Sequence, residues 1–332
     1  MPSCKWLVTF SLLFAASALA VAQTGISDPG ARQLCATVKD VEPPVEDRPS
    51  AAEEKALANC SSLDLYFGFG QPADPVKARK CAYAEIDRSA KVLLGGKAIL
   101  MMVYANGKGA PRNFDLALKF SCAIPGDAPG DAAGRVHQLD RLRKANWPGS
   151  NFSVCDHSSG REMYEQCAIL QERFDKIERD QKFNELISKW TSGQQKAFRV
   201  FMQEADRFLK VQASNGVNLE GTFEVQEEAF LRNNLLSNLQ QFEAGELPKS
   251  SDDEFQSAEA AERSTYMRTQ SGDVSRWGTV TRESVRTSEE AWRRYCNAWI
   301  AFARQRYPAV SEKTWKSWLD QERVVTLSRF LH

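Results

Sequence analysis

The first segment of the chain sets the chemical conditions under which the rest must fold. Lys5 precedes an apolar run from Trp6 to Leu19, and Ala20-Val21-Ala22 follows as a small-x-small cleavage site. This order is typical of a secretory signal peptide, and the run is short for a membrane span. An uncleaved anchor is the alternative, which the cleavage site disfavours. We therefore expect a mature chain without a membrane span, in the periplasm or secreted.

Export changes how the cysteines are interpreted, because an oxidising compartment converts thiols into cross-links. Cys296 lies alone far downstream, and the other cysteines after the leader are expected to form three bridges: Cys35, Cys60, Cys81, Cys122, Cys155 and Cys167. Sequence alone does not determine the pairing; we expect Cys60–Cys81 and Cys155–Cys167, leaving Cys35–Cys122. A zinc site at Cys155, His157 and Cys167 is the alternative, but it lacks a fourth ligand and a close Cys-x-x-Cys pair.

The overall charge excludes one class of function. Lys and Arg number 43, and Asp and Glu also number 43, so the formal net charge is zero. General nucleic-acid binding needs a net basic face, which such a chain is not expected to present. We predict no cofactor and no metal, and the sequence does not determine the oligomeric state.

Changes in composition divide the chain into five segments. We expect a signal peptide at 1–22, a flexible lead-in at 23–50, a helical hairpin region at 51–150, a central helical region at 151–250 and a C-terminal helical domain at 251–332. The predicted fold class is all-α: helical hairpin repeats followed by a helical bundle, with disulfides in the N-terminal half.

The hairpin region contains two related units. Gly68-Phe69-Gly70 and Gly107-Lys108-Gly109 each separate two helical stretches, at 51–67 and 74–90 and at 97–105 and 114–123. After the second glycine, each unit has a short polar residue four places on and an alanine eight places on. The second unit resembles a Sel-like repeat, a relative of the tetratricopeptide repeats, at Leu100, Tyr104, Gly107, Gly109, Asn113 and Ala117. Two unrelated hairpins are the alternative.

The strongest periodic pattern lies near the C-terminus. A stripe rich in aromatic residues advances by steps of three and four: Val285, Ser288, Trp292, Tyr295, Trp299, Phe302 and Arg306. Pro308 ends this helix, and Ser311 is the predicted N-cap of a final helix. We expect the stripe to form a packed core, with a binding interface as the alternative.

This segment resembles the lysozyme-inhibitor LprI-like domain. The matching positions are Ala291-Trp292, Tyr295, Ala298-Trp299, Tyr307-Pro308, Trp315, Leu319, Arg323 and Leu327. The chain departs from the family pattern where Glu289 replaces Gln and Cys296-Asn297 replaces Arg-Asp. The resemblance implies a non-enzymatic protein that binds a lysozyme, and the departures put the family's charged contact at that pair in doubt.

Motifs of the common enzyme classes are missing. The chain has no Gly-x-Ser-x-Gly, no phosphate loop and no His-Glu-x-x-His. Glu283-Ser284 is similar to the Glu-Ser of lytic transglycosylases, but the other elements of that family are not found. A peptidoglycan-cleaving enzyme that uses Glu283 is therefore a remote alternative, because the carboxyl would need a dry pocket.

The first hypothesis is a non-enzymatic binding protein of the bacterial envelope whose helical surface engages a protein partner. Many lysozymes are basic, so an acidic face would steer their association. The candidates are Glu227-Glu228, Glu243, Glu246 and Asp252-Asp253-Glu254. The second hypothesis is a structural envelope factor that uses the hairpins as a protein-interaction scaffold.

Overall fold

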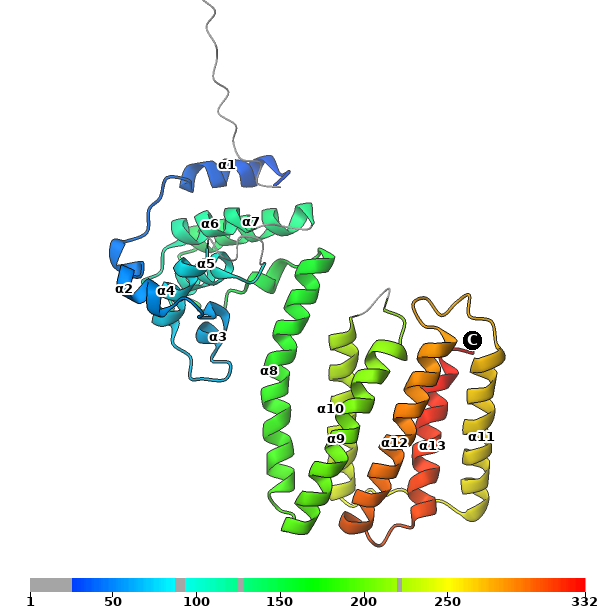
Figure 1. Ribbon diagram of the computed structural model, residues 1–332. Coiled ribbons are helices and arrows are strands. Elements are labelled where there is room, and N and C mark those ends of the chain that lie inside the picture. Colours follow the sequence, from blue (N-terminus) through cyan, green and yellow to red (C-terminus); the bar gives the residue numbers. More distant parts are fainter. Residues whose placement is uncertain (1–25, 87–92, 125–127, 220–222, 332) are drawn as a thin grey trace, which may run out of the picture. The chain divides into compact units, whose positions relative to one another are not determined.

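The computed structural model describes residues 26–86, 93–124, 128–219 and 223–331. The predicted signal peptide lies outside these ranges. Thirteen α-helices and two short 3-10 helices form the secondary structure of the described residues, which contain no strand (Figure 1). The predicted all-α class is confirmed. The chain divides into two compact units, 1–163 and 164–332, and none of the described helices is long and apolar enough to span a membrane.

Part of the segment 23–50, which was expected as a flexible lead-in, has secondary structure. Its described part forms α1 (Pro29–Val38) and the 3-10 helix η1 (Val45–Asp47). Asp28 caps α1 by accepting a hydrogen bond from the backbone N–H of Ala31, and Pro29 supplies the φ angle of a first helical residue. These local signals, together with a disulfide at Cys35, stabilise a helix in a segment that composition alone marks as a loop.

A buried polar cluster holds η1 onto the hairpins. Asp47 and Arg79 form an ion pair of 3.1 Å, and both side chains are buried. Tyr104 donates a 2.8 Å hydrogen bond to the second carboxylate oxygen of Asp47, and the hydroxyls of Tyr83 and Tyr104 lie 2.7 Å apart. Because every member has a partner, this cluster fixes the lead-in against the hairpins.

The predicted helical stretches at 97–105 and 114–123 are confirmed. The described residues from 51 to 123 form five helices. They are α2 (Ala51–Ala56), α3 (Ser62–Phe67), α4 (Pro75–Glu85), α5 (Gly96–Asn106) and α6 (Phe114–Ala123). The predicted helix at 51–67 is broken into α2 and α3, because Ser61 starts a new helix by capping it. Nearly all residues of α5 are buried, so α5 is the central helix of this unit.

The two glycine turns share their geometry. All four turn glycines have positive φ, and a side chain at Gly109 would place its Cβ 2.3 Å from the backbone oxygen of Pro75. Asp74 and Asn113 cap the helices that follow the two turns. The N–H of each capping residue donates to the helix before its turn, at Leu65 and Tyr104 respectively. The predicted similarity of the two units therefore extends to their hydrogen bonds.

The segment after the hairpins is also helical. α7 (Pro129–Lys144) has Pro129 in its first turn. Asp131 in that turn accepts hydrogen bonds from the backbone N–H groups of Ser159 and Gly160. The 3-10 helix η2 (Val154–His157) follows α7.

The disulfides confirm two of the expected pairs. Cys35 on α1 is bonded to Cys122 on α6, and Cys60 is bonded to Cys81 on α4. Cys155 and Cys167 are also disulfide-bonded, and Cys296 has a free thiol. Because both cysteines of the alternative zinc cluster are oxidised, they cannot supply the thiolates that zinc requires.

The second unit contains the long helices, which are α8 (Arg161–Ile187, shared with the end of the first unit), α9 (Ser192–Asn215), α10 (Glu224–Glu243), α11 (Asp252–Ser271), α12 (Arg282–Arg306) and α13 (Glu312–Ser328). Thr191 and Gln194 form a capping box at the start of α9, and Ser311 caps α13 as predicted.

Aromatic side chains from α9, α10, α12 and α13 form one core. Trp299 is completely buried and makes ring contacts with Phe201, Phe242 and Trp315. The apolar residues of the predicted stripe between 285 and 302 are all buried, which confirms the core interpretation. Regions predicted as separate, 151–250 and 251–332, contribute to this same core through α9, α10, α12 and α13.

Helix α11 lies at the edge of this arrangement. It packs along α13 and touches α12 at only a few residues, and α13 lies between α12 and α11 in Figure 1. A groove lies between α11, α12 and α13.

Candidate functional site

A groove of about 590 Å³ lies between α11, α12 and α13. Polar and charged side chains dominate its lining, which is Glu259, Glu262, Arg263, Tyr266, Glu289, Trp292, Arg293, Cys296, Asn297, Ile300, Glu312, Lys316 and Asp320. On α13 these positions recur every four residues, and on α11 and α12 they alternate between steps of three and steps of one, so each helix contributes one stripe. On α12 this stripe is next to the aromatic one, and the two stripes face the groove and the core respectively.

A buried network closes the floor of the groove. Arg323 is 2% exposed and Glu289 is 3% exposed, and they form an ion pair of 3.0 Å. Arg323 also donates hydrogen bonds to Gln212 and Ser288, and Ser288 donates to Gln212. The network joins α9, α12 and α13. Its ion pair and hydrogen bonds offset the free-energy cost of burying the Arg323 guanidinium.

The basic residues of the lining are already engaged. Lys316 pairs with Asp320 at 2.9 Å and with Glu259 at 3.3 Å. Arg293 reaches the second oxygen of Glu289 at 3.1 Å. Burial raises the pKa of Asp320, while the neighbouring Lys316 opposes that rise. The acids and bases on α12 and α13 therefore largely neutralise one another.

Glu262 on α11 is the exception. Its Oε1 atom is buried and has no hydrogen-bond partner, and no ion pair found among the described residues includes this carboxylate. Burial raises the pKa of Glu262 to about 7, and the negative charges of Glu289 and Asp320 add to the rise. A carboxyl group that lines a groove and lacks a cationic partner is the chemical feature that distinguishes this site.

The two positions at which the chain departs from the LprI-like Arg-Asp pair lie in the same groove. Cys296 and Asn297 line it on α12, where the LprI-like pattern has Arg-Asp. Cys296 is partly buried, and burial together with Asp320 and Glu289 raises its thiol pKa well above the ordinary value. The thiol is therefore kept protonated and unreactive.

The remaining family positions form the support of the groove. Tyr295, Trp299, Trp315 and Leu319 belong to the aromatic core, and Arg323 belongs to the buried network. Trp292 belongs to the core and also lines the groove, with Arg323 lying 5.6 Å from its ring centroid.

Four of the predicted acidic candidates are paired within the fold. Glu228 pairs with Arg232 at 2.7 Å, and Glu243 pairs with Arg306 and accepts a hydrogen bond from Tyr307. Glu227 lies 3.9 Å from Arg329. Glu254 caps α11 together with Ser251. Asp252 pairs with Lys313, and Glu246 and Asp253 are exposed. These residues do not form one uncompensated acidic face.

Glu283 does not have the surroundings that glycan cleavage requires. Its side chain is 68% exposed at the start of α12 and forms an ion pair with Arg286. A general acid in glycoside hydrolysis needs a dry pocket, and Glu283 lines none of the described ones.

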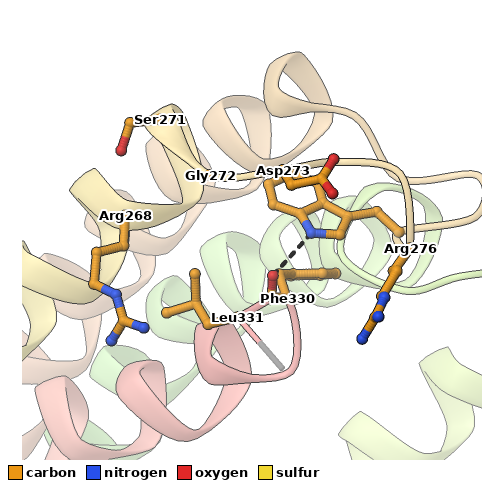
Figure 2. A pocket seen from close by; sticks show the side chains of 8 residues that line it. Arg268, Ser271, Gly272, Asp273, Arg276, Phe330 and Leu331 are labelled. Carbon is orange, nitrogen blue, oxygen red and sulfur yellow. Dashed lines mark hydrogen bonds between the residues drawn. The ribbon is translucent and has the colours of Figure 1, made fainter.

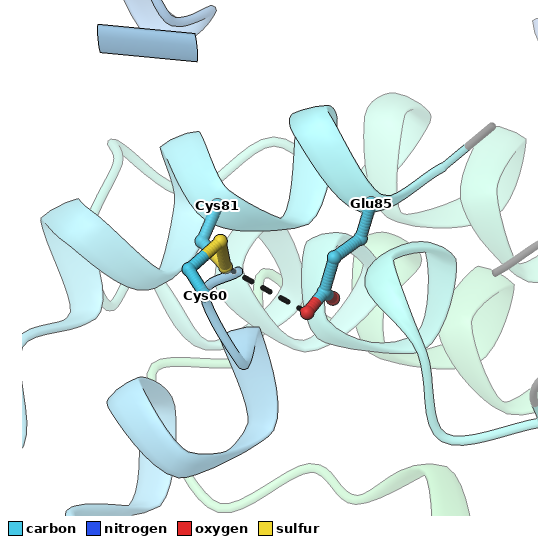
Figure 3. A group of neighbouring side chains, drawn as sticks. All are labelled: Cys60, Cys81 and Glu85. Carbon is cyan, nitrogen blue, oxygen red and sulfur yellow. Dashed lines mark hydrogen bonds between the residues drawn. A yellow bond between two sulfur atoms is a disulfide. The ribbon is translucent and has the colours of Figure 1, made fainter. Parts of the chain in front are cut away.

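A second cluster with the composition of a metal site is structural. Cys60, Cys81 and Glu85 lie close together in the first unit (Figure 3), but the two sulfur atoms are bonded to each other. Glu85 accepts hydrogen bonds from the backbone N–H and the hydroxyl of Ser62, so it fixes the start of α3. This cluster therefore joins α3 to α4.

A second hollow, of about 350 Å³, lies where α11 ends. Figure 2 shows Arg268 and Arg276 on opposite sides of Phe330 and Leu331, and the indole N–H of Trp277 donates a 2.8 Å hydrogen bond to the Phe330 carbonyl. Both arginines are exposed, and the hollow contains no buried polar group without a partner. It is the weaker candidate.

Sequence reasoning did not find Glu262, Glu259 or Lys316. The available signal was a polar stripe on α11, at Glu259, Glu262 and Tyr266, facing a stripe of charged residues on α13. Comparison with protein-family models, with curated proteins and with solved structures finds no match to this chain. The two family resemblances therefore stay predictions.

Proposed function

We propose that this chain is a non-enzymatic binding protein of the bacterial envelope, periplasmic or secreted, that engages a protein partner through its C-terminal unit. The observation that carries this proposal is the groove between α11, α12 and α13, with a carboxyl group that the described chain leaves unpaired. The disulfide bonds are consistent with an oxidising compartment.

A basic protein is the partner that the groove favours. Five carboxyl groups and three basic side chains line the groove, so its lining carries an excess of acidic groups. The LprI-like resemblance suggests a lysozyme, and many lysozymes are basic. We propose that a lysozyme binds at this groove and is inhibited.

A wall-lysis assay tests this function. Purified protein without its leader is titrated into a lysozyme reaction and is also incubated with peptidoglycan alone. We expect slower lysis in the first reaction and no glycan release in the second. Unchanged lysis would reject the lysozyme proposal and leave the hairpin scaffold as the better hypothesis. Glycan release that is lost in Glu283→Gln would instead establish the enzymatic alternative.

A further inference from the structure

Charge pairing leaves one carboxyl group of the groove unused. On α13, Lys316 lies between Glu259 and Asp320. On α12, Glu289 is paired with both Arg293 and Arg323. Once these pairs are formed, the buried Oε1 of Glu262 remains without a donor. A buried oxygen in this state costs free energy, which a bound cation would recover.

The walls around Glu262 suit a side chain with a long apolar stem. Trp292, Cys296 and Ile300 form the less polar side of the groove, and Asn297 stands exposed at its edge. Lysine and arginine both place methylene groups on apolar surface while their charged heads reach a polar partner. The groove volume of about 590 Å³ leaves room for such a side chain.

We propose that the groove is a subsite for one cationic side chain of the partner, an arginine or a lysine, whose charged head pairs with Glu262. This inference rests on the proposed function only in taking the partner to be a protein. The stem lies against Trp292 and Ile300, and the bound cation replaces the partner that the fold does not supply.

Binding is coupled to the loss of a proton from Glu262. The pKa of the free carboxyl is raised to about 7, and a bound cation favours the ionised form. We expect affinity to rise about tenfold between pH 6 and pH 8, because the ionised fraction rises by that factor.

Charged and titratable groups from three helices surround Glu262. From α11 these are Glu259, Arg263 and Tyr266, from α12 Glu289, Arg293 and Cys296, and from α13 Glu312, Lys316, Asp320 and Arg323. Burial raises the pKa values of Tyr266 and Cys296 further above the neutral range. No histidine lines the groove.

Small probes test the subsite without any partner protein. The leaderless chain is titrated by calorimetry with Nα-acetyl-arginine methylamide, with the lysine analogue and with the neutral citrulline analogue. We expect saturable binding of at least one cationic probe, and none of citrulline, which keeps the shape of arginine without its charge. Glu262→Gln should weaken binding about tenfold to a hundredfold, as for a lost hydrogen bond to a charged group.

Glu283→Gln is the matched control, because it also removes one carboxylate but lies exposed and paired with Arg286. It should bind the probes as the unchanged chain does. Equal binding of arginine and citrulline, or equal binding by Glu262→Gln, would overturn the subsite. If the probe binds but lysozyme is not inhibited, the subsite proposal is kept and lysozyme is rejected as the partner. If the Glu262→Gln variant inhibits lysozyme as well as the unchanged chain does, lysozyme is kept as the partner and the subsite proposal is rejected.

Discussion

The two units of this chain hold their helices together by different interactions. The hairpin unit uses disulfides and a buried polar cluster around Asp47 and Arg79 to fix short helices. The bundle of α9 to α13 uses stacked aromatic rings and contains one cysteine, the free Cys296. Burial of large aromatic side chains stabilises the long helices. This stability offsets the free-energy cost of the unpaired Glu262 carboxyl group in the groove. The difference therefore locates the candidate site in the bundle.

Removal of a disulfide should have the largest effect, confined to the hairpin unit. The Cys35–Cys122 bridge closes a separation of 87 residues. Cys35→Ser with Cys122→Ser should lower local stability by about 4 to 5 kcal/mol on the chain-entropy account. Hydrogen exchange should show lost protection in α1 and α6, with α9 and α12 unchanged. Cys296→Ala is the control and should leave protection in α1 and α6 intact.

Truncation of the aromatic core should have the next largest effect, in the bundle. Trp299 is completely buried between α9, α10 and α13. Trp299→Ala should cost about 4 kcal/mol, because a large cavity replaces its contacts. Guanidinium unfolding followed by tryptophan fluorescence measures this loss. Hydrogen exchange serves as a second measurement. If Trp299→Ala lowers exchange protection equally in the hairpin unit and in the bundle, the two units do not unfold separately.

Breaking the buried network should cost slightly less. Glu289→Ala leaves Arg323 with its hydrogen bonds to Gln212 and Ser288 but without its counter-charge. The expected loss is about 3 kcal/mol, and the exposed neighbour Glu290→Ala is the control, with an effect near zero. Equal effects of the two substitutions would mean that the network does not support the floor of the groove.

The smallest expected effect is that of Glu262→Gln, which should raise the stability of the bundle instead of lowering it. The folded chain holds the Glu262 proton up to about pH 7, whereas the ordinary carboxyl pKa is 4.5. Between these values the folded state binds more protons than the unfolded state, so stability falls as pH rises through this window. Glu262→Gln removes that loss and should stabilise the bundle by about 1 kcal/mol at pH 8, after discounting for solvent screening. Below pH 4.5 the substitution should have little effect, and unfolding curves at the two pH values check this.

Local patterns predicted much of this fold. The helix cap at Ser311, the glycine turns and the buried aromatic stripe all depend on residues a few positions apart. The lead-in helix α1 was missed because one capping residue and one disulfide outweigh a composition that favours a loop. Short-range rules are reliable where the stabilising contact is itself short-range.

The groove could not be predicted in the same way. Its existence depends on α11 packing along α13 and away from α12, and no periodicity in α11 specifies that choice. The state of Glu262 depends on which acids of α12 and α13 are already paired with Arg293, Arg323 and Lys316. The LprI-like pattern includes Cys296 and Asn297, which line the groove on α12. It does not include Glu262, which lies on α11.

The central claim is that the fold leaves the Glu262 carboxyl group without a cation. A site-resolved carbon NMR titration of the Glu262 side-chain carboxyl group tests it directly, with Glu283 as an internal reference for an exposed, paired carboxylate. We predict a titration midpoint for Glu262 near pH 7, which falls when the arginine probe is added. A midpoint at or below the ordinary carboxyl value of 4.5 would show that the chain already supplies the partner and would contradict the account.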